Sequence, residues 1–117
     1  MNNQELGQQG ESTAARYLLS RGYALLEQNW RFQQKEIDLI ATKNDELIII
    51  EVKTRQSNRF GEAWQFVNRS KQRYMIYAAN AYAQKVNWPG AVRFDIIGIC
   101  HQPYRLEHIE DAFYASL

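Results

Sequence analysis

The sequence predicts a single α/β domain over residues 1–117, in which helices flank a mixed sheet. Three observations predict this fold class. Two segments carry apolar residues at helical spacing, four others are rich in aliphatic and aromatic residues, and turn-forming residues separate the segments. With 117 residues, the chain is long enough for one hydrophobic core and too short for two.

The N-terminal half predicts one helix followed by three strands. A helix over residues 3–21 is indicated by apolar residues at helical spacing and by Gly22, which follows as a C-terminal stop. Residues 23–33 are rich in aromatic and aliphatic side chains and predict a strand. Two further strands, 36–43 and 46–54, flank Asn44-Asp45, a pair that favours a tight turn.

The C-terminal half predicts a helix and at least one more strand. The helix covers residues 62–85, and its apolar stripe consists of Trp64, Val67, Tyr74, Met75, Ala78, Ala81 and Tyr82. Pro89-Gly90 breaks the chain before a strand over residues 92–100. The tail, residues 104–114, is expected to form a last strand or an irregular edge. The predicted element order is therefore α-β-β-β-α-β, with the tail left open.

The predicted hairpin gathers charged residues at one end of one face. With Asn44-Asp45 as the turn, the opposed residues are Lys43 with Glu46, Asp38 with Glu51, and Glu36 with Lys53. Side chains opposed in this way point to the same face, with Cβ atoms about 4.5–5.5 Å apart. The other face is wholly apolar and consists of Ile37, Leu39, Ala41, Ile48, Ile50 and Val52.

Two opposed carboxylates in strands that are expected to be buried repel each other. A divalent cation bound between them would relieve this repulsion. Carboxylate oxygens are the ligands that Mg²⁺ and Mn²⁺ prefer. Asp38 and Glu51 are therefore candidate metal ligands, and Lys53 is a candidate to hold an attacking water or a phosphate oxygen. The alternative is a salt-bridge ladder at a solvated strand end, in which Lys53 pairs with Asp38 or Glu51 and binds no metal.

Two residues outside the hairpin are candidates for the same site. Glu11 lies at helical spacing with Ala14 and Leu18, so it is a candidate third metal ligand, directly or through a water; a solvated residue of the first helix is the alternative. Lys71 lies on the apolar stripe of the second helix, and its ammonium is expected to reach toward the site or a phosphate, unless it is an ordinary surface lysine.

Basic residues are concentrated between Lys53 and Arg73, where six basic residues face one acid and give a net charge of +5. The rest of the chain has a net charge of −4. Such segregation is typical of a polyanion-binding face beside an acidic site, although exposed helices also carry charge.

Six short stretches together resemble the YraN-like family of small bacterial proteins. They are "GE" at 10–11, "EIDLIA" at 36–41, "IIIEVKTR" at 48–55, "FGEA" at 60–63, Lys71, and "RFDII" at 93–97. That family is similar to the PD-(D/E)xK endonuclease superfamily, and particularly to its Holliday-junction resolvases. The resemblance implies a restriction-endonuclease-like core, with Asp38, Glu51 and Lys53 as the catalytic motif and Glu11 as the acid of the first helix.

This chain departs from the family pattern at two positions. The proline that precedes the aspartate in the superfamily is Ile37 here, and the glycine usual before "EID" is Lys35. Lys35 is expected either to contact phosphate or to crowd the groove.

The leading hypothesis is a Mg²⁺- or Mn²⁺-dependent nuclease that acts on DNA in repair or recombination. Arg55, Arg59, Lys71 and Lys35 are the expected nucleic-acid contacts. The alternatives are a non-catalytic nucleic-acid-binding module and a partner adaptor with an aromatic interface. The single cysteine and the polar N-terminus favour a cytoplasmic protein, and the longest apolar run, residues 47–50, is too short to span a membrane. Pairing into a homodimer is left open.

Overall fold

A computed structural model of the protein describes residues 1–57 and 67–114. The helices and strands among these residues are, in chain order, α1 (Asn3–Ser20), β1 (Ala24–Phe32), β2 (Lys35–Lys43), β3 (Glu46–Ser57), α2 (Arg69–Lys85), β4 (Ala91–Gln102) and β5 (Tyr104–Phe113). In this described part of the chain, no helix is long and apolar enough to cross a membrane.

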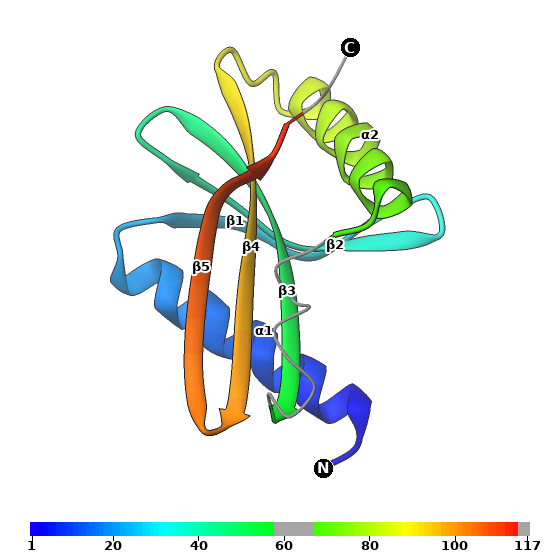
Figure 1. Ribbon diagram of the computed structural model, residues 1–117. Coiled ribbons are helices and arrows are strands. Elements are labelled where there is room, and N and C mark those ends of the chain that lie inside the picture. The colour runs from blue at the N-terminus through cyan, green and yellow to red at the C-terminus, as the bar shows by residue number, and fades with distance from the viewer. Residues whose placement is uncertain (58–66, 115–117) are drawn as a thin grey trace.

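The strands form one mixed sheet in the order β1-β2-β3-β4-β5 (Figure 1). β3 and β4 are parallel, and the other neighbours are antiparallel. Parallel neighbours need a crossover connection, which here contains α2. The predicted α/β class and its restriction-endonuclease-like core are confirmed. The tail forms a fifth strand, β5, so the element order is α-β-β-β-α-β-β.

The two helices cover opposite faces of the sheet (Figure 1). Leu47 and Ile49 of β3 belong to the core cluster that contains Met75 of α2. Ile48 belongs to the other cluster, together with Leu18 of α1. Because successive side chains of a strand point to opposite faces, α1 and α2 must lie on opposite sides of β3. The short aliphatic run of this strand thus supplies both cores at once.

The predicted hairpin register is confirmed over its first five residue pairs, from Lys43 opposite Glu46 to Leu39 opposite Ile50. The turn residues Asn44 and Asp45 have φ angles of 52° and 66°. A two-residue hairpin turn of type I′ requires positive φ at both positions, and Asn and Asp tolerate this conformation better than most residues. The local sequence therefore sets the register.

Three sequence predictions need correction. The predicted strand pairs of Asp38 with Glu51 and of Glu36 with Lys53 are not formed, because the ladder between β2 and β3 ends with Leu39 opposite Ile50. α2 begins at Arg69 rather than at residue 62, because the extended Asn68 caps it by accepting a 2.8 Å hydrogen bond from the Lys71 backbone N–H. Trp64, expected on the stripe of this helix, lies outside the described residues. Ile37, expected on the face of Leu39, packs instead in the cluster on the α2 side. Strict alternation fails at this point because β2 leaves β3 directly after Leu39.

The "RFDII" stretch supplies a buried ionic cluster rather than a second reactive site. Asp95 is wholly buried and accepts hydrogen bonds from Arg93 Nε and Nη2, from the Asp111 N–H, and, at 2.7 Å, from the His108 ring. These bonds hold the pKa of Asp95 below its usual value, although burial acts in the opposite direction. A buried charge with this many partners is satisfied, and it ties β5 to β4.

Candidate active site

β2 and β3 part at the position of the two candidate metal ligands. Their paired register ends with Leu39 opposite Ile50. Beyond that pair, β2 continues beside β1 alone, while β3 continues beside β4. Figure 1 shows the β1–β2 hairpin turning away from the lower part of β3. We call this opening, flanked by Asp38 and Glu51, the fork.

The side chain of Asp38 supplies the hydrogen bond that follows the last backbone pair between β2 and β3. Its Oδ2 accepts a 2.8 Å hydrogen bond from the Val52 backbone N–H, which β2 no longer pairs with through its own backbone. A backbone N–H that is partly withdrawn from water needs such a partner. The carboxylate of Asp38 is thereby held against β3, next to the side chain of Glu51.

The carboxylate of Glu51 lies close enough to that of Asp38 to raise the pKa of Asp38. Burial, followed by the charge of Glu51 and a hydrogen bond to it, raises the pKa of Asp38 from 3.8 to about 7, although the Val52 N–H opposes the shift. A like-charged partner in a poorly solvated place makes the second negative charge costly. The fork therefore holds two close carboxylates, and Asp38 has a strongly raised pKa beside Glu51.

Glu11 reaches the same place from α1. Burial is the main cause that raises its pKa, and the charge of Asp38 and a hydrogen bond to Asp38 add to it. Asn29 of β1 opposes the shift, since its Nδ2 donates a 3.0 Å hydrogen bond to Glu11 Oε1. The structure thus brings Glu11, Asp38 and Glu51 together, with Asp38 in the middle.

Asn29 is a residue that the sequence prediction missed. It lies within β1 with a φ of 52°, in the left-handed region that asparagine adopts more readily than most residues. An asparagine within the predicted strand over residues 23–33 was the available signal, because asparagine is depleted in strands. The side-chain amide of Asn29 donates to the Glu11 carboxylate and orients it.

Two lysines bring positive charge to the acids. Lys71 of α2 places its Nζ 3.6 Å from Glu51 Oε1, and the two side chains are 31% and 15% exposed. This orientation toward the fork is the one expected from its place on the apolar stripe. Lys53 of β3 has a lowered pKa, mainly because it is partly withdrawn from water, and the charges of Arg55 and Lys71 act in the same direction while Glu51 opposes them.

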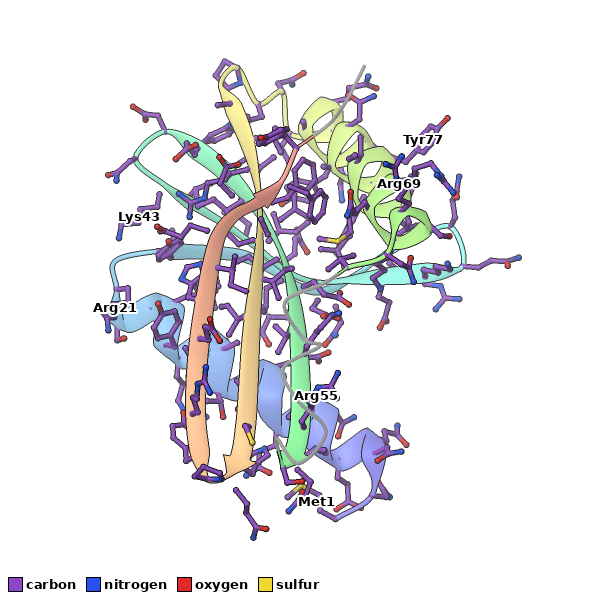
Figure 2. The ribbon with its side chains drawn as sticks, in the orientation of Figure 1. Met1, Arg21, Lys43, Arg55, Arg69 and Tyr77 are labelled. Carbon is purple, nitrogen blue, oxygen red and sulfur yellow. The ribbon has the colours of Figure 1, made fainter. Side chains whose placement is uncertain are left out.

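Three further residues were predicted to contact nucleic acid, and the structure describes two of them. Lys35, exposed at the start of β2, has its Nζ 5.6 Å from the centre of the Tyr74 ring, which Lys71 Nζ approaches to 5.9 Å. Arg55 is half-buried on the lower part of β3 (Figure 2). Arg59 lies outside the described residues. Lys35, Lys71 and Arg55 therefore form a basic rim around the fork.

No three Asp, Glu, His or Cys side chains within residues 1–57 and 67–114 form a group arranged to hold a metal ion. The carboxylates at the fork fit a hard divalent cation by the chemistry of their oxygens. Mg²⁺ commonly takes one or two protein carboxylates and fills its other positions with water and phosphate oxygens. The pair of Asp38 and Glu51 meets that smaller requirement.

The close approach of α1 to β3 positions Glu11. A Cβ at Gly10 would collide with Thr54 Oγ1 and lie 3.0 Å from Thr54 Cβ, so only glycine allows the helix to sit here. We expect Gly10→Ala to lower the free energy of unfolding by about 1–3 kcal/mol, as other overpacked sites do. Thermal melting of the purified variant measures this effect.

Gly7→Ala is the matched control for that experiment, because nothing lies within 4 Å of a Cβ at Gly7. Alanine is the better helix former by about 1 kcal/mol, so this variant should melt at the same temperature as the parent or higher. If Gly10→Ala behaves like Gly7→Ala, α1 does not depend on a close contact with Thr54.

The fold and the fork together define a protein with a restriction-endonuclease-like core that carries an acid cluster and two lysines where its central strands separate. The chain belongs to the uncharacterised protein family UPF0102, which it matches over residues 10–99. This is the family of YraN-like proteins that the short motifs predicted.

Three relatives illustrate the extent of the similarity. The chain is 43% identical over 115 residues to a UPF0102 protein of Phocaeicola vulgatus, covering 97% of this chain and 95% of the relative. It is 44% identical over 120 residues to one of Chlorobium chlorochromatii, covering 96% and 93% of the two chains. It is 41% identical over 114 residues to one of Clostridioides difficile, covering 97% and 100%.

Proposed function

We propose that the protein is a Mg²⁺- or Mn²⁺-dependent nuclease that hydrolyses phosphodiester bonds of DNA, in repair or recombination in the cytoplasm. The observation that carries the proposal is the carboxylate pair at the fork, whose burial and mutual repulsion raise the pKa of Asp38 to about 7 beside Lys53 and Lys71. Neither the hydrogen bond of Asp38 with the Val52 N–H nor the ion pair of Glu51 with Lys71 requires the two acids to lie side by side.

Asp38 and Glu51 would hold the cation, and Glu11 would contribute through a metal-bound water. When bound, the cation supplies charge neutralisation and a more acidic water for hydrolysis. Lys53 would hold the attacking water or a phosphate oxygen in place, since a compact ammonium stabilises developing negative charge. Its lowered pKa is consistent with a partly desolvated position near the reacting group.

The experiment that tests this function is a cleavage panel. Duplex, single-stranded, flap and four-way DNA substrates are incubated with the protein, with and without Mn²⁺. We expect cleavage of at least one substrate only when Mn²⁺ is present. The absence of cleavage of every substrate in the presence of Mn²⁺ would contradict the proposed activity.

One observation favours a second candidate, a non-catalytic nucleic-acid-binding module. Lys71 lies 3.6 Å from Glu51 and already neutralises part of the acid pair without a cation. Such a module would bind DNA through the same basic rim, but Mn²⁺ would neither bind to the fork nor promote cleavage. The same panel therefore separates the two candidates.

The basic rim predicts an electrostatic mode of binding. We expect the double variant Arg55→Ala, Lys71→Ala to bind duplex DNA more weakly than the parent at every sequence tested. Each lost phosphate contact should reduce the slope of log affinity against log salt concentration by about 0.9. Fluorescence anisotropy titrations at several salt concentrations measure both quantities.

The double variant Arg21→Ala, Lys43→Ala is the control, because it removes the same charge from a different part of the molecule (Figure 2). It should retain the affinity and the salt dependence of the parent. Equal losses in both double variants would show that binding depends on net charge rather than on the rim.

A further inference from the structure

A groove lies between α2 and the C-terminal end of β5, separate from the fork. Its volume is about 650 Å³, and its lining includes Arg69, Arg73 and Tyr77 from α2 together with Asp111 of β5 and Tyr114 just after it. An adjoining hollow of about 490 Å³ shares Tyr77 and Tyr114 and continues along α2. Sites for small organic groups commonly have volumes of about 300–1,000 Å³.

Two tyrosines at this groove expose most of their surface. Tyr77 is 70% exposed and Tyr114 is 73% exposed. Neither ring stacks on another ring in the described part of the chain. Their aromatic faces are therefore available to a planar ligand.

Two arginines line the N-terminal end of the same groove. Arg69 and Arg73 are four residues apart on α2, so they lie on one side of the helix. Both are exposed, and neither forms an ion pair with another residue within the described ranges. Lys71, between them in sequence, points toward Glu51 instead. The first turns of α2 thus present cations both to the fork and to the groove.

Charged and aromatic groups in this arrangement match the chemistry of an unpaired nucleic-acid strand. Its phosphates need cations, and its bases need flat apolar surfaces on which to stack. A paired duplex hides the faces of its bases and could use the arginines but not the tyrosines. The carboxylate of Asp111 would repel phosphates from its own end of the groove and leave them to the arginines.

We propose that this groove binds a single-stranded segment of nucleic acid, with its phosphates on Arg69 and Arg73 and its bases on Tyr77 and Tyr114. The inference rests on the proposed function, since it takes nucleic acid as the ligand, and it narrows the substrate to one with an unpaired strand. That strand passes from the fork around the N-terminal turns of α2 into the groove.

The test is the binding of a fluorescein-labelled oligothymidylate, measured by anisotropy in EDTA so that no cleavage occurs. The double variant Tyr77→Ala, Tyr114→Ala should bind this probe roughly tenfold more weakly and a blunt duplex as the parent does. The double variant Arg69→Ala, Arg73→Ala should reduce the salt slope for the probe by about 1.4. Circular dichroism checks that each variant is folded.

Tyr104→Ala is the matched control, because Tyr104 is 63% exposed at the other end of β5 and does not line the groove. Unchanged binding of the probe by the Tyr77 and Tyr114 variant would overturn the inference, even if Mn²⁺-dependent cleavage persists and the proposed function stands. Conversely, weakened binding of the probe by the Tyr77→Ala, Tyr114→Ala variant, together with a parent protein that never cleaves, would support the groove and count against hydrolysis.

A second copy of the chain is the competing occupant of the groove. Sedimentation velocity of the parent and of the Tyr77→Ala, Tyr114→Ala variant distinguishes the two occupants. If the parent is a dimer, the variant is a monomer, and the variant still binds the probe, the inference is overturned and the groove is assigned to self-association. A mass that does not change between the two proteins, with probe binding weakened, supports the single strand.

Discussion

Asp38→Asn is expected to abolish Mn²⁺-dependent cleavage. The rate should fall at least about 100-fold, which corresponds to about 2.7 kcal/mol of activation free energy. Asparagine keeps an oxygen that can accept from the Val52 N–H, so the fork should retain its shape. It lacks the negative charge that a divalent cation needs from this position. Single-turnover cleavage of the best substrate from the panel measures the loss.

The same substitution should stabilise the metal-free protein at high pH. The folded pKa of Asp38 is about 7 against 3.8 for an unperturbed aspartate, so between these values the folded state binds the proton that the unfolded state has released. The parent therefore loses stability as pH rises through this window. The variant has no such loss from this position, because an amide does not titrate there.

At pH 8 the gain in the free energy of unfolding should be about 1–3 kcal/mol. The difference between the folded and unfolded pKa values of Asp38 corresponds to about 4 kcal/mol. The gain should stay below this value, because the neutral amide accepts a weaker hydrogen bond from the Val52 N–H than the carboxylate does. Near pH 4, where the Asp38 carboxyl is protonated in the folded protein, the two proteins should be almost equally stable. A variant that is less stable than the parent at pH 8 would instead support a salt-bridge role for Asp38.

Lys53→Ala is expected to lose cleavage while keeping the cation site. Removing one group that stabilises developing charge commonly costs about 10²–10³ in rate. Neither Asp38 nor Glu51 changes in this variant, so the affinity for Mn²⁺ should stay within a few-fold of the parent. Isothermal titration with Mn²⁺ and single-turnover cleavage of the same preparation measure the two properties separately.

Lys43→Ala is the control for this variant, because Lys43 is the last residue of β2, at the hairpin turn and away from the fork. It should cleave at the rate of the parent. Parallel losses of Mn²⁺ affinity and cleavage in Lys53→Ala would mean that Lys53 maintains the acid pair rather than acting on the water or the phosphate.

The sequence was sufficient to predict the part of the site that depends on local pattern. Asn44-Asp45 defines the turn, the turn defines the register, and the register places Asp38 near Glu51. The spacing on the stripe of α2 likewise predicted that Lys71 would turn inward, and the structure places its ammonium beside Glu51. These features follow from the local spacing of residues along single strands, turns and helices.

Features that depend on how distant segments meet were not predictable in this way. The separation of β2 from β3 moves Ile37 to the α2 side of the sheet, which strict alternation excludes. The hydrogen bond from Asn29 to Glu11 joins β1 to α1, and Asn29 has a positive φ within a strand. The late start of α2 depends on a cap by Asn68, which competes with a longer run of helical spacing.

The measurement that tests the central claim most directly is thermal melting of the parent in a titration with Mn²⁺ at pH 8. If the carboxylates at the fork hold the cation, the melting temperature should rise with Mn²⁺, and the free energy of unfolding should gain about 2.7 kcal/mol at about 100 times the dissociation constant. Asp38→Asn should show no such rise. A parent whose melting temperature is unchanged by millimolar Mn²⁺, with or without DNA, would contradict the metal site.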